Sequence, residues 1–412
     1  MSRVIALCFL LLAAVIGFLH IDSRPVWAPF ATPSFQVDEV LVEPAVTKTK
    51  GPIKVSIPAP QSHWLPDTGA ASVHAASMIV LKDSAVRAFW FAGSREGAAD
   101  VSIYSSVYDP KASSWSAPIV VMDRISAERG LSRYIAKLGN PVPARLADGR
   151  LQLFFVTVSI GGWAGSSISA ITSDDEGLTW SKPQRLISSP LLNLSTLVKS
   201  PNVMFADGLL GLPAYHEWIG RFGEFLRLDA GQVIDKRRMS SGRGAIQPLV
   251  FVNDAQDASA YFRQTRSSGL PKKIPVSHTE NAGQTWQQAE DLAIANPNSA
   301  VAGLVLKSGA RILVLNNIEN GRYRLVLLMS DVKSGQWQTI EVLEDDEAVP
   351  EAQRKEFSYP YLITVDGDDA HLAYTWDRKK IRHRYFSGAW LRHTYQQINS
   401  AEAGPAHQEV QQ

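Results

Sequence analysis

Three short stretches of the chain place polar and aromatic residues together in otherwise apolar surroundings. Residues 215–218 read Tyr-His-Glu-Trp after a Leu-Pro strand, so Glu217 is either a catalytic carboxylate or one half of a His–Glu pair in the core. Residues 161–165 surround Trp163 with glycine and alanine, where the indole stacks on a sugar face or fills a turn. Residues 378–383 carry two arginines and a histidine, which bind an anion or form a solvated face.

These residue types suit a ligand that is rich in oxygen and negatively charged. Arginine binds a carboxylate through two parallel hydrogen bonds, which makes a sialate or a uronate a sensible ligand. A tyrosine phenol, whose pKa is ordinarily near roughly 10, needs a positive charge or a carboxylate base beside it to act at neutral pH.

Metal and cofactor chemistry are not expected from the sequence. His216 and Glu217 are not followed by a second histidine at metalloprotease spacing, because position 220 is Gly. Cys8 is the single cysteine, so a multi-cysteine zinc site and an internal disulfide framework are both excluded. The chain also has no P-loop and no nucleophile elbow.

The elements that must position such residues are short β-strands. Residues 88–91, 151–156, 258–262 and 311–315 are apolar or alternating, and Gly, Asp and Asn bound them, as is typical of strands. No long pattern of period 3.6 competes with them in the body of the chain. The body is therefore predicted to be all-β.

An internal repeat makes the prediction of the fold more specific. Residues 173–180 fit the pattern Ser-x-Asp-x-Gly-x-Thr-Trp, residues 279–286 repeat it with similar residues, and fainter copies end at Trp115 and Trp337. The intervals between these tryptophans, 65, 106 and 51 residues, fit one, two and one units of a four-stranded blade. Asp or Asn closes the turn, Gly supplies a positive φ and Trp packs between sheets, so the repeat is a folding device without chemistry. The body then holds about six blades.

The N-terminal region is predicted to direct export. After Arg3, residues 4–19 carry no charged or strongly polar side chain, as in a signal peptide or a short signal anchor. No small-x-small cleavage site is evident before residues 21–23, so a hydrophobic helix at residues 4–20 is expected to anchor the body on the periplasmic side of the inner membrane. A cleaved chain would be secreted.

The charge balance of the chain bears on its partners, and its composition bears on its division into segments. Lys and Arg total 41 against 40 Asp and Glu, interspersed along the chain, so nucleic acid is not an expected partner. The oligomeric state is not indicated. We predict four segments: a signal anchor or signal peptide at residues 1–22, a Pro-rich stalk at 23–60, the propeller at 61–392 and a flexible tail at 393–412.

With these Asp-box repeats, the sequence resembles the sialidase, or BNR-repeat, superfamily over essentially the whole body. The resemblance implies a sialidase-like six-bladed β-propeller that acts on a glycan. It also implies a site in which three arginines bind the substrate carboxylate, a Tyr–Glu pair supplies the nucleophile and an Asp is the acid/base. By position, the nucleophile is Tyr359, the acid/base is Asp100, and Arg263 and Arg322 are two of the three arginines. The other candidate binding residues are His74, Arg95, Gln247, Tyr361 and Arg378.

Two positions depart from the family pattern. His74 stands where the first arginine would lie in a Phe-Arg-Ile-Pro segment, so one arginine is missing unless Arg95 replaces it. Gln247 stands where the glutamate that activates the tyrosine would lie, and an amide cannot accept the phenol proton. Glu217 is the carboxylate that could take its place.

Three functions remain open on this basis. The first, which we favour, is a sialidase-like glycoside hydrolase that acts on an acidic sugar, sialic acid or uronate, in a glycan or exopolysaccharide. The second is a polysaccharide lyase on the same propeller, in which His74 and a tyrosine would exchange protons with a uronate. The third is a non-catalytic carbohydrate-binding or assembly protein, in which the altered positions mark lost chemistry.

Overall fold

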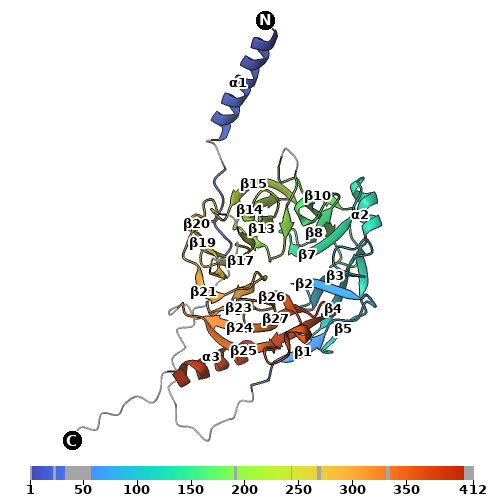
Figure 1. The fold of residues 1–412 in the computed structure, drawn as a ribbon, viewed down its shortest axis with the longest axis vertical. Helices are drawn as coiled ribbons and strands as arrows, with labels where there is room; N and C mark the ends of the chain where they lie inside the picture. Colours follow the sequence, from blue (N-terminus) through green and yellow to red (C-terminus); the bar gives the residue numbers. More distant parts are fainter. Residues whose placement is uncertain are drawn as a thin grey trace, which may run out of the picture.

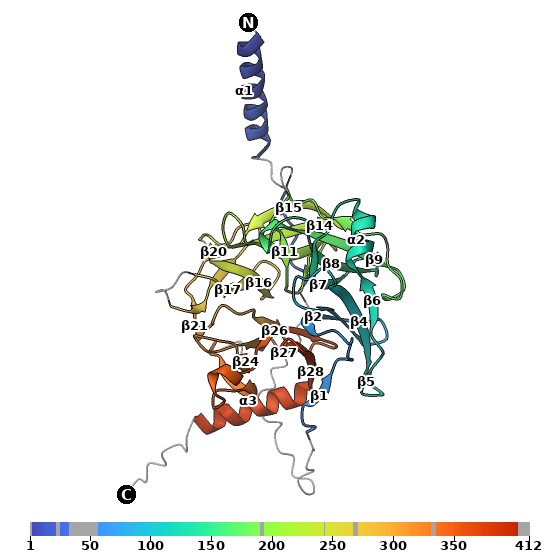
Figure 2. The ribbon, with the colours of Figure 1, turned by 45° about the vertical axis from the view of Figure 1, so that its right-hand side comes forward.

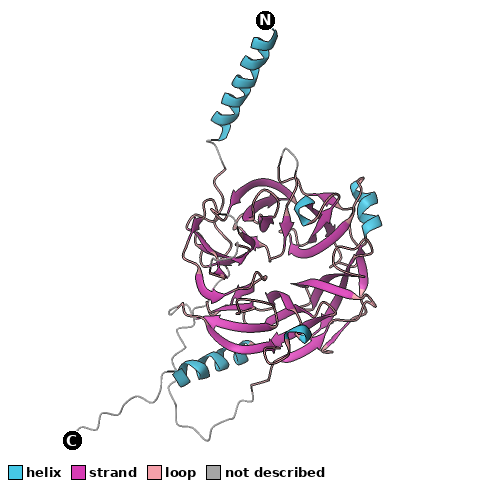
Figure 3. Ribbon diagram, viewed as in Figure 1, coloured by secondary structure: helices cyan, strands magenta, loops and turns pink. Residues whose placement is uncertain are grey.

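The computed structural model describes residues 2–21, 25–32, 57–189, 193–242, 244–266, 271–330 and 335–402. Within these ranges, six β-sheets of four or five strands stand around a common axis as the blades of a propeller (Figure 1). Strands form the ring itself, and the helices lie outside it or at its edge (Figure 3). The predicted all-β, six-bladed β-propeller is therefore confirmed.

Each blade is an antiparallel sheet that begins with its innermost strand. Blade 1 contains β2 (Ser72–Val80), β3 (Val86–Gly93), β4 (Ser102–Asp109), β5 (Ser114–Trp115) and β6 (Ile119–Met122). Blade 2 contains β7 (Lys137–Arg145), β8 (Leu151–Val158), β9 (Ser166–Ser173) and β10 (Gln184–Arg185). Blade 3 contains β11 (Leu197–Val198), β12 (Val203–Met204), β13 (Leu210–His216), β14 (Phe222–Asp229) and β15 (Gln232–Arg238).

The second half of the ring follows the same plan. Blade 4 contains β16 (Ala245–Val252), β17 (Ala258–Gln264), β19 (Val276–Thr279) and β20 (Gln287–Gln288), and a small separate sheet pairs β18 (Lys273–Ile274) with β21 (Leu292–Ala295). Blade 5 contains β22 (Ala302–Val305), β23 (Arg311–Leu315), β24 (Arg324–Ser330) and β25 (Gln338–Asp345). Blade 6 contains β26 (Phe357–Thr364), β27 (Ala370–Trp376), β28 (Lys380–Phe386) and, as its outermost strand, β1 (Gln61–Trp64).

The ring is closed by strands from the two ends of the propeller. β1 lies beside β28 in Figure 2. The two strands pair antiparallel, with Gln61 opposite Tyr385 and Trp64 opposite Arg382. The remaining elements are α1 (Ser2–Ile21), α2 (Arg124–Leu131), α3 (Gly388–Glu402) and two 3-10 turns, Trp163–Gly165 and Glu351–Gln353.

Apolar strands fill the space between blades because each blade has a neighbour on both faces. β3 and β8 are buried at every position, which explains why these segments are apolar almost throughout. Phe89 of blade 1 and Phe155 of blade 2 belong to one cluster with Ile171, so the side chains of adjacent blades interlock. Burial of this kind is the main favourable contribution to folding.

The first strong copy of the repeat forms a closed turn between β9 and β10. The Oγ of Ser173 accepts the backbone N–H of Gly177 at 2.8 Å. The carboxylate of Asp175 accepts the N–H of Thr179 at 2.8 Å and its hydroxyl at 2.6 Å. Gly177 has a φ of 91°, a conformation that glycine adopts at little cost. The residues of the motif are therefore occupied with one another.

The second strong copy forms the same turn between β19 and β20. Thr279 Oγ1 accepts the N–H of Gly283 at 2.9 Å, and Asn281 Oδ1 accepts the N–H of Thr285 at 2.9 Å. All four tryptophans of the repeat lie in, or shortly before, the outermost strand of the ladder that carries them: Trp115, Trp180, Trp286 and Trp337. The structural role predicted for the repeat is confirmed.

The described part of the expected stalk, residues 25–32, lies against the propeller. Trp27 is buried, donates its indole N–H to Asp235 at 2.9 Å and packs edge-on against Phe205. Phe30 is buried as well, stacks on Phe205 and donates its backbone N–H to Ala255 at 2.8 Å. This part of the expected stalk is therefore fixed to the propeller, because its two aromatic side chains belong to the core. Residues 33–56 lie outside the described ranges.

The two ends of the chain also differ in part from expectation. α1 agrees with the predicted N-terminal helix. Among the described residues, no helix combines the length and the apolar character needed to cross a membrane. α3 extends through residues 393–402, where a flexible tail was expected, because Leu391 and Tyr395 are buried against blades 5 and 6. Residues 403–412 lie outside the described ranges.

Candidate functional site

Four innermost strands share one irregularity, a β-bulge at the same point of the blade. In β2, β7, β16 and β26 the ladder shifts register around residues 75, 140, 247 and 359. These residues have positive φ values of 51°, 44°, 52° and 52°. Such a conformation costs a non-glycine residue on the order of 1–3 kcal/mol, and a bulge turns the side chain out of the regular alternation. The strained residues bring side chains of different blades together.

Tyr359 lies at the centre of this group. Its Oη accepts hydrogen bonds from Nη1 of Arg263 at 3.3 Å and from Nε2 of Gln247 at 3.4 Å. The imidazole of His74 packs against the phenol ring, with the ring centroids 4.4 Å apart. The phenol oxygen is therefore held beside a positive charge and an amide, both from blade 4, and the cluster joins residues of blades 1, 4 and 6.

A second tyrosine extends the cluster beyond Gln247. Tyr215, at the end of β13, accepts hydrogen bonds at its Oη from Gln247 Nε2 at 3.2 Å and from Asn140 Nδ2 at 3.3 Å. Burial, together with the charges of Tyr359 and Glu217, raises the pKa of Tyr215 well above its ordinary value. Tyr215 is therefore a neutral hydroxyl that positions Gln247.

Arg263 reaches the site from the end of β17. Its Nε donates to Oδ1 of Asn298 at 2.7 Å, and its Nη1 also lies 3.5 Å from Oε1 of Gln247. With Tyr359, its described hydrogen-bond partners are all neutral. Arg263 is thus an arginine whose charge is not neutralised by a direct ion pair among the described residues.

Arg322 and Arg378 belong to a chain of ion pairs that links residues of three blades. Arg378 Nη1 donates to Glu96 at 2.5 Å and its Nε to Glu356 at 3.0 Å. Arg322 donates to Glu356 at 3.1 Å and to the carbonyl of Asn298 at 3.0 Å. The two arginines and two glutamates alternate, so this chain of charges is balanced internally.

The pKa values within this chain follow from its contacts. Burial raises the pKa of Glu356, but hydrogen bonds from Arg378 and Ser358 and the charge of Arg322 outweigh burial and lower it to about 2. Burial also disfavours the charge on Arg378, but its bonds to Glu356 and Glu96 raise its pKa. Both groups therefore stay charged at neutral pH.

Two buried bases lie next to Tyr359. Burial lowers the pKa of His74 to about 4, and neither ring nitrogen has a hydrogen-bond partner among the described residues. Burial, and secondarily the charge of Arg263, lowers the pKa of Lys199 to about 7. Lys199 donates to the carbonyls of Val301 at 2.8 Å and Pro360 at 2.6 Å, which ties blade 3 to blades 5 and 6 at the axis.

Glu217 is a carboxylate whose charge acts on Tyr215 and which is itself affected by the charge of Arg263. The buried His–Glu pair of this stretch is formed by His216 and Glu224, whose Nε2 and Oε2 lie 2.6 Å apart, and not by Glu217. Burial raises the pKa of Glu217, while the charge of Arg263 opposes that shift. A carboxyl group with a raised pKa accepts a proton more readily than an ordinary one.

The remaining predicted residues lie at the edge of the site or outside it. Asp100 accepts hydrogen bonds from the N–H and the hydroxyl of Ser94, both at 2.9 Å, on the loop that carries Glu96. These bonds lower the pKa of Asp100, which is fully exposed. Arg95 is exposed, and Arg378 rather than Arg95 takes part in the ion-pair chain. Tyr361 is buried in the core between blades 6 and 1, and burial raises its pKa.

Sequence reasoning missed several members of the site. No role was assigned to four residues that belong to the site. Tyr215, Glu96 and Glu356 each bond to a predicted residue, and Asn140 bonds to Tyr215. A signal for Asn140 was present, because residues 140–141, 247–248 and 359–360 all place a polar residue before proline inside an apolar inner strand. The glutamates had no comparable signal.

The fold of the propeller is similar to that of solved sialidases. A Hadza microbial sialidase superposes with a TM-score of 0.62 at 14% sequence identity, over 77% of this chain and 66% of that one, so the chain spans slightly less than two thirds of that sialidase. The NanB sialidase of Streptococcus pneumoniae superposes with a TM-score of 0.60 at 12% sequence identity, over 78% of this chain and 69% of that one. A protein of unknown function from Dyadobacter fermentans superposes with a TM-score of 0.64 at 12% sequence identity, over 80% of this chain and all of that one.

Sequence comparison identifies the family. The model of the BNR repeat-like domain matches residues 84–372, which is most of the propeller. The chain belongs to this BNR repeat-like family. Among proteins of curated function, none matches the chain in sequence. At 11–14% identity, the structural likeness extends to the fold and not to the substrate.

Proposed function

We propose that this protein is a sialidase-like glycoside hydrolase that removes an acidic sugar, sialic acid or uronate, from a glycan or exopolysaccharide. The observation that carries the proposal is the position of Tyr359 Oη, 3.3 Å from the guanidinium of Arg263 at the propeller axis. A phenol nucleophile is the known exception to the pair of carboxylates that most glycosidases use.

The residues divide the reaction between them. Tyr359 Oη attacks the anomeric carbon as the bond to the leaving oxygen breaks. Asp100, the expected acid, has a lowered pKa and is ionised at neutral pH, so the leaving oxygen takes its proton from solvent. Gln247 cannot accept the phenol proton, so Glu217, whose pKa is raised by burial, takes it. Arg263 offers positive charge beside the oxygen in the transition state, where such a preorganised group is most effective. Water then releases the sugar from Tyr359.

The substrate carboxylate binds Arg263 in this proposal. Arg322 and Arg378 already hold Glu356 and Glu96, whereas the described hydrogen-bond partners of Arg263 are neutral. An arginine fork without a bound carboxylate is the group that gains most from an anionic ligand. We therefore expect one anionic group per sugar rather than several.

One observation favours a lyase as the second candidate. His74 is neutral at pH 7, packs on Tyr359 and has two ring nitrogens without partners among the described residues. A neutral histidine can abstract the proton next to a uronate carboxylate while Tyr359 protonates the leaving oxygen. The product would then contain a double bond conjugated with the carboxylate.

The decisive experiment incubates the full chain with sialosides and uronate-containing polysaccharides and records released reducing sugar together with absorbance of unsaturated uronate. We expect reducing sugar without unsaturated product, and a loss of at least about a thousandfold in Tyr359→Phe, since removing a nucleophile has effects of this order. Unsaturated product would establish the lyase. No product on any substrate from the folded protein would contradict both enzymes and favour a carbohydrate-binding protein.

We also propose that the protein acts outside the cytoplasm. The support is the uncharged segment at residues 4–19 that follows Arg3 at the start of the chain. Cell fractionation of the full chain, compared with a chain that begins after residue 22, tests this. Recovery of both chains in the cytoplasm would contradict it.

A further inference from the structure

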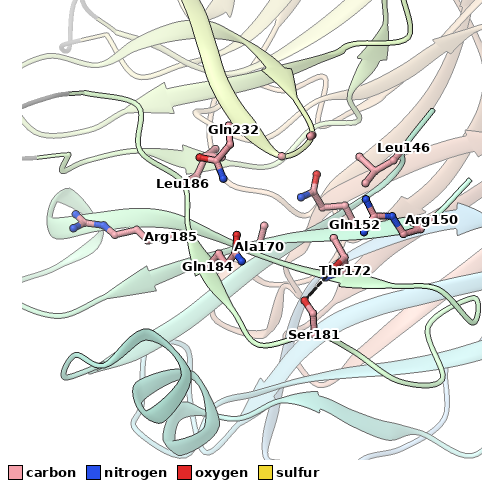
Figure 4. Close-up of a pocket in the computed structure, with 12 residues that line it drawn as sticks. Leu146, Arg150, Gln152, Ala170, Thr172, Ser181, Gln184, Arg185, Leu186 and Gln232 are labelled. Carbon is pink, nitrogen blue, oxygen red and sulfur yellow. Dashed lines mark hydrogen bonds between the residues drawn. The ribbon is translucent and has the colours of Figure 1, made fainter. Parts of the chain in front are cut away.

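A pocket of about 230 Å³ lies between blades 2 and 3, away from the candidate site. We call it the blade 2–3 pocket. Its blade 2 wall comes from the β7–β8 turn, β8, β9, β10 and the end of the first Asp-box turn, and its blade 3 wall comes from the β14–β15 turn. In Figure 4, Gln232 of blade 3 lies across from Gln184 and Thr172 of blade 2. Because one ordered water needs only roughly 10–15 Å³, the pocket has room for a ligand of many atoms.

Amides and hydroxyls dominate the polar lining. Three glutamines, Gln152, Gln184 and Gln232, face the pocket together with the hydroxyl side chains of Thr172 and Ser181. An amide offers both donors and an acceptor, so three of them in one pocket match a ligand that carries several hydroxyl groups. Leu146, Leu186 and Ala170 supply an apolar wall of the kind that ligand pockets combine with a few polar groups.

Gln152 gives the strongest sign of an absent partner. Its side chain is 4% exposed, and its Oε1 is buried without a hydrogen-bond donor among the described residues. An amide oxygen in such a position costs free energy until a donor reaches it. The N–H and hydroxyl groups nearby are committed elsewhere, since Ser181 Oγ accepts from the N–H of Thr172 at 3.0 Å and from its hydroxyl at 3.1 Å. A ligand hydroxyl is suited to donate to Gln152.

The two arginines of the lining do not require an anionic ligand. Arg150 lines the pocket, but its guanidinium is paired with Asp148 at 2.8 Å, so it adds donors without a net charge. Arg185 also contributes to the lining, but Figure 4 shows its guanidinium turned away from Gln152. It donates to the carbonyl of Asn193 at 2.7 Å. We propose that the blade 2–3 pocket binds a neutral, hydroxyl-rich saccharide unit.

This binding site is separate from the candidate catalytic site. Asn140, in β7, belongs to the Tyr359 cluster, and Leu146, which directly follows β7, lines the pocket. The length of β7 therefore separates the two sites. Six residues of a strand span roughly 20 Å. A saccharide in the pocket therefore does not touch Tyr359, and the inference does not depend on the reaction proposed above. In a polymer substrate, the pocket would hold a neutral unit remote from the cleaved end.

The test measures binding of methyl β-galactoside and methyl β-glucoside to the full chain by ligand-observed saturation-transfer NMR. Gln184→Trp places a large side chain at an exposed pocket position, and Gln152→Leu removes the unpaired amide at similar volume. We expect each to reduce the saturation transfer at least fivefold. Gln152→Leu should not lower the unfolding temperature, because the lost amide oxygen had no partner among the described residues.

Arg263→Ala separates the two sites. We expect this variant to retain saturation transfer with both glycosides, because Arg263 does not line the blade 2–3 pocket. If wild type shows no transfer, or if transfer survives in Gln184→Trp and disappears in Arg263→Ala, the inference is wrong. Should Gln152→Leu fail to fold, Gln184→Trp alone decides, since Gln184 is exposed at an edge strand.

Discussion

The Asp-box turns at the outer strands and the Tyr359 cluster at the axis are built in opposite ways. In the Asp-box turns, the Ser, Thr, Asp and Asn side chains of the motif bond to residues two or four positions away, such as Asp175 to Thr179. At the axis, Arg263 and Tyr359 are 96 positions apart and Glu96 and Arg378 are 282 apart. The outer turns are therefore local devices that fold each blade, whereas the axis depends on the completed ring. Substitutions in the two regions should separate stability from activity.

Arg263→Met should produce the largest effect, and on activity. The side chain keeps much of its volume but loses the charge beside Tyr359, which we expect to lower kcat/KM by about 100- to 1000-fold, as for removal of a group that stabilises charge in a transition state. The unfolding temperature should change little. Steady-state kinetics on the substrate identified above, with thermal unfolding, measure both. Arg311→Met is the matched control, because Arg311 donates to Asn253 outside the cluster. If Arg263→Met and Arg311→Met have the same kcat/KM, Arg263 takes no part in the reaction.

His74 should make the axis sensitive to acid. Its pKa is about 4 in the folded chain and near 6.5 in the unfolded chain, so the neutral ring stabilises the fold above pH 6.5. This stability is lost as the pH falls from 6.5 towards 4, by up to about 3 kcal/mol. His74→Phe should reduce the pH dependence of the unfolding free energy over that range in denaturant titrations.

His371 provides the comparison for His74. Its pKa is also lowered to about 4 by burial, but it lies in the core of blade 6 beside His383. His371→Phe should therefore reduce the pH dependence of the unfolding free energy over the same range and leave turnover unchanged. An unaltered pH dependence in His74→Phe would mean that His74 is not buried as a neutral ring in solution.

The two Asp-box turns should give the smallest effects, and on stability alone. Ser173→Ala and Thr279→Val each remove the acceptor for a buried glycine N–H, which we expect to cost about 1–2 kcal/mol of unfolding free energy. The costs should be alike and should add in the double variant, since the turns share no contacts. Chemical denaturation measures them, and kcat should not change. A loss of turnover in either variant would show that the outer turns and the axis are coupled.

The difference between local and distant contacts also explains what the sequence could predict. The Asp boxes, the strands and the number of blades were predictable, because their residues interact with near neighbours. The roles of Tyr359, Arg263 and Gln247 could be reached only through resemblance to a family, since the proline that follows Tyr359 and Gln247 marks a position in the strand and not a chemical role. Glu96 lacked even that support, because its partner Arg378 lies on the opposite side of the ring closure.

The N-terminal segment illustrates the same limit. Its prolines predicted an extended spacer, but Trp27 packs on Phe205 and Phe225, which follow it by roughly 200 residues in the chain. The composition of a segment indicates its stiffness, but it does not indicate the tertiary contacts that the segment makes. An indole in a Pro-rich stretch is the kind of residue for which a distant partner should be sought.

The pairing of β1 with β28 also sets an order in time. β1 is the first strand of the propeller to be synthesised, and its partner in the sheet is the last. At typical synthesis rates of about 5–20 residues per second, roughly 15–65 s pass before that partner emerges. Because the pairing is so distant in sequence, ring closure is expected to be a late step of folding. Until then β1 remains an unpaired edge, and the Tyr359 cluster cannot assemble on a nascent chain.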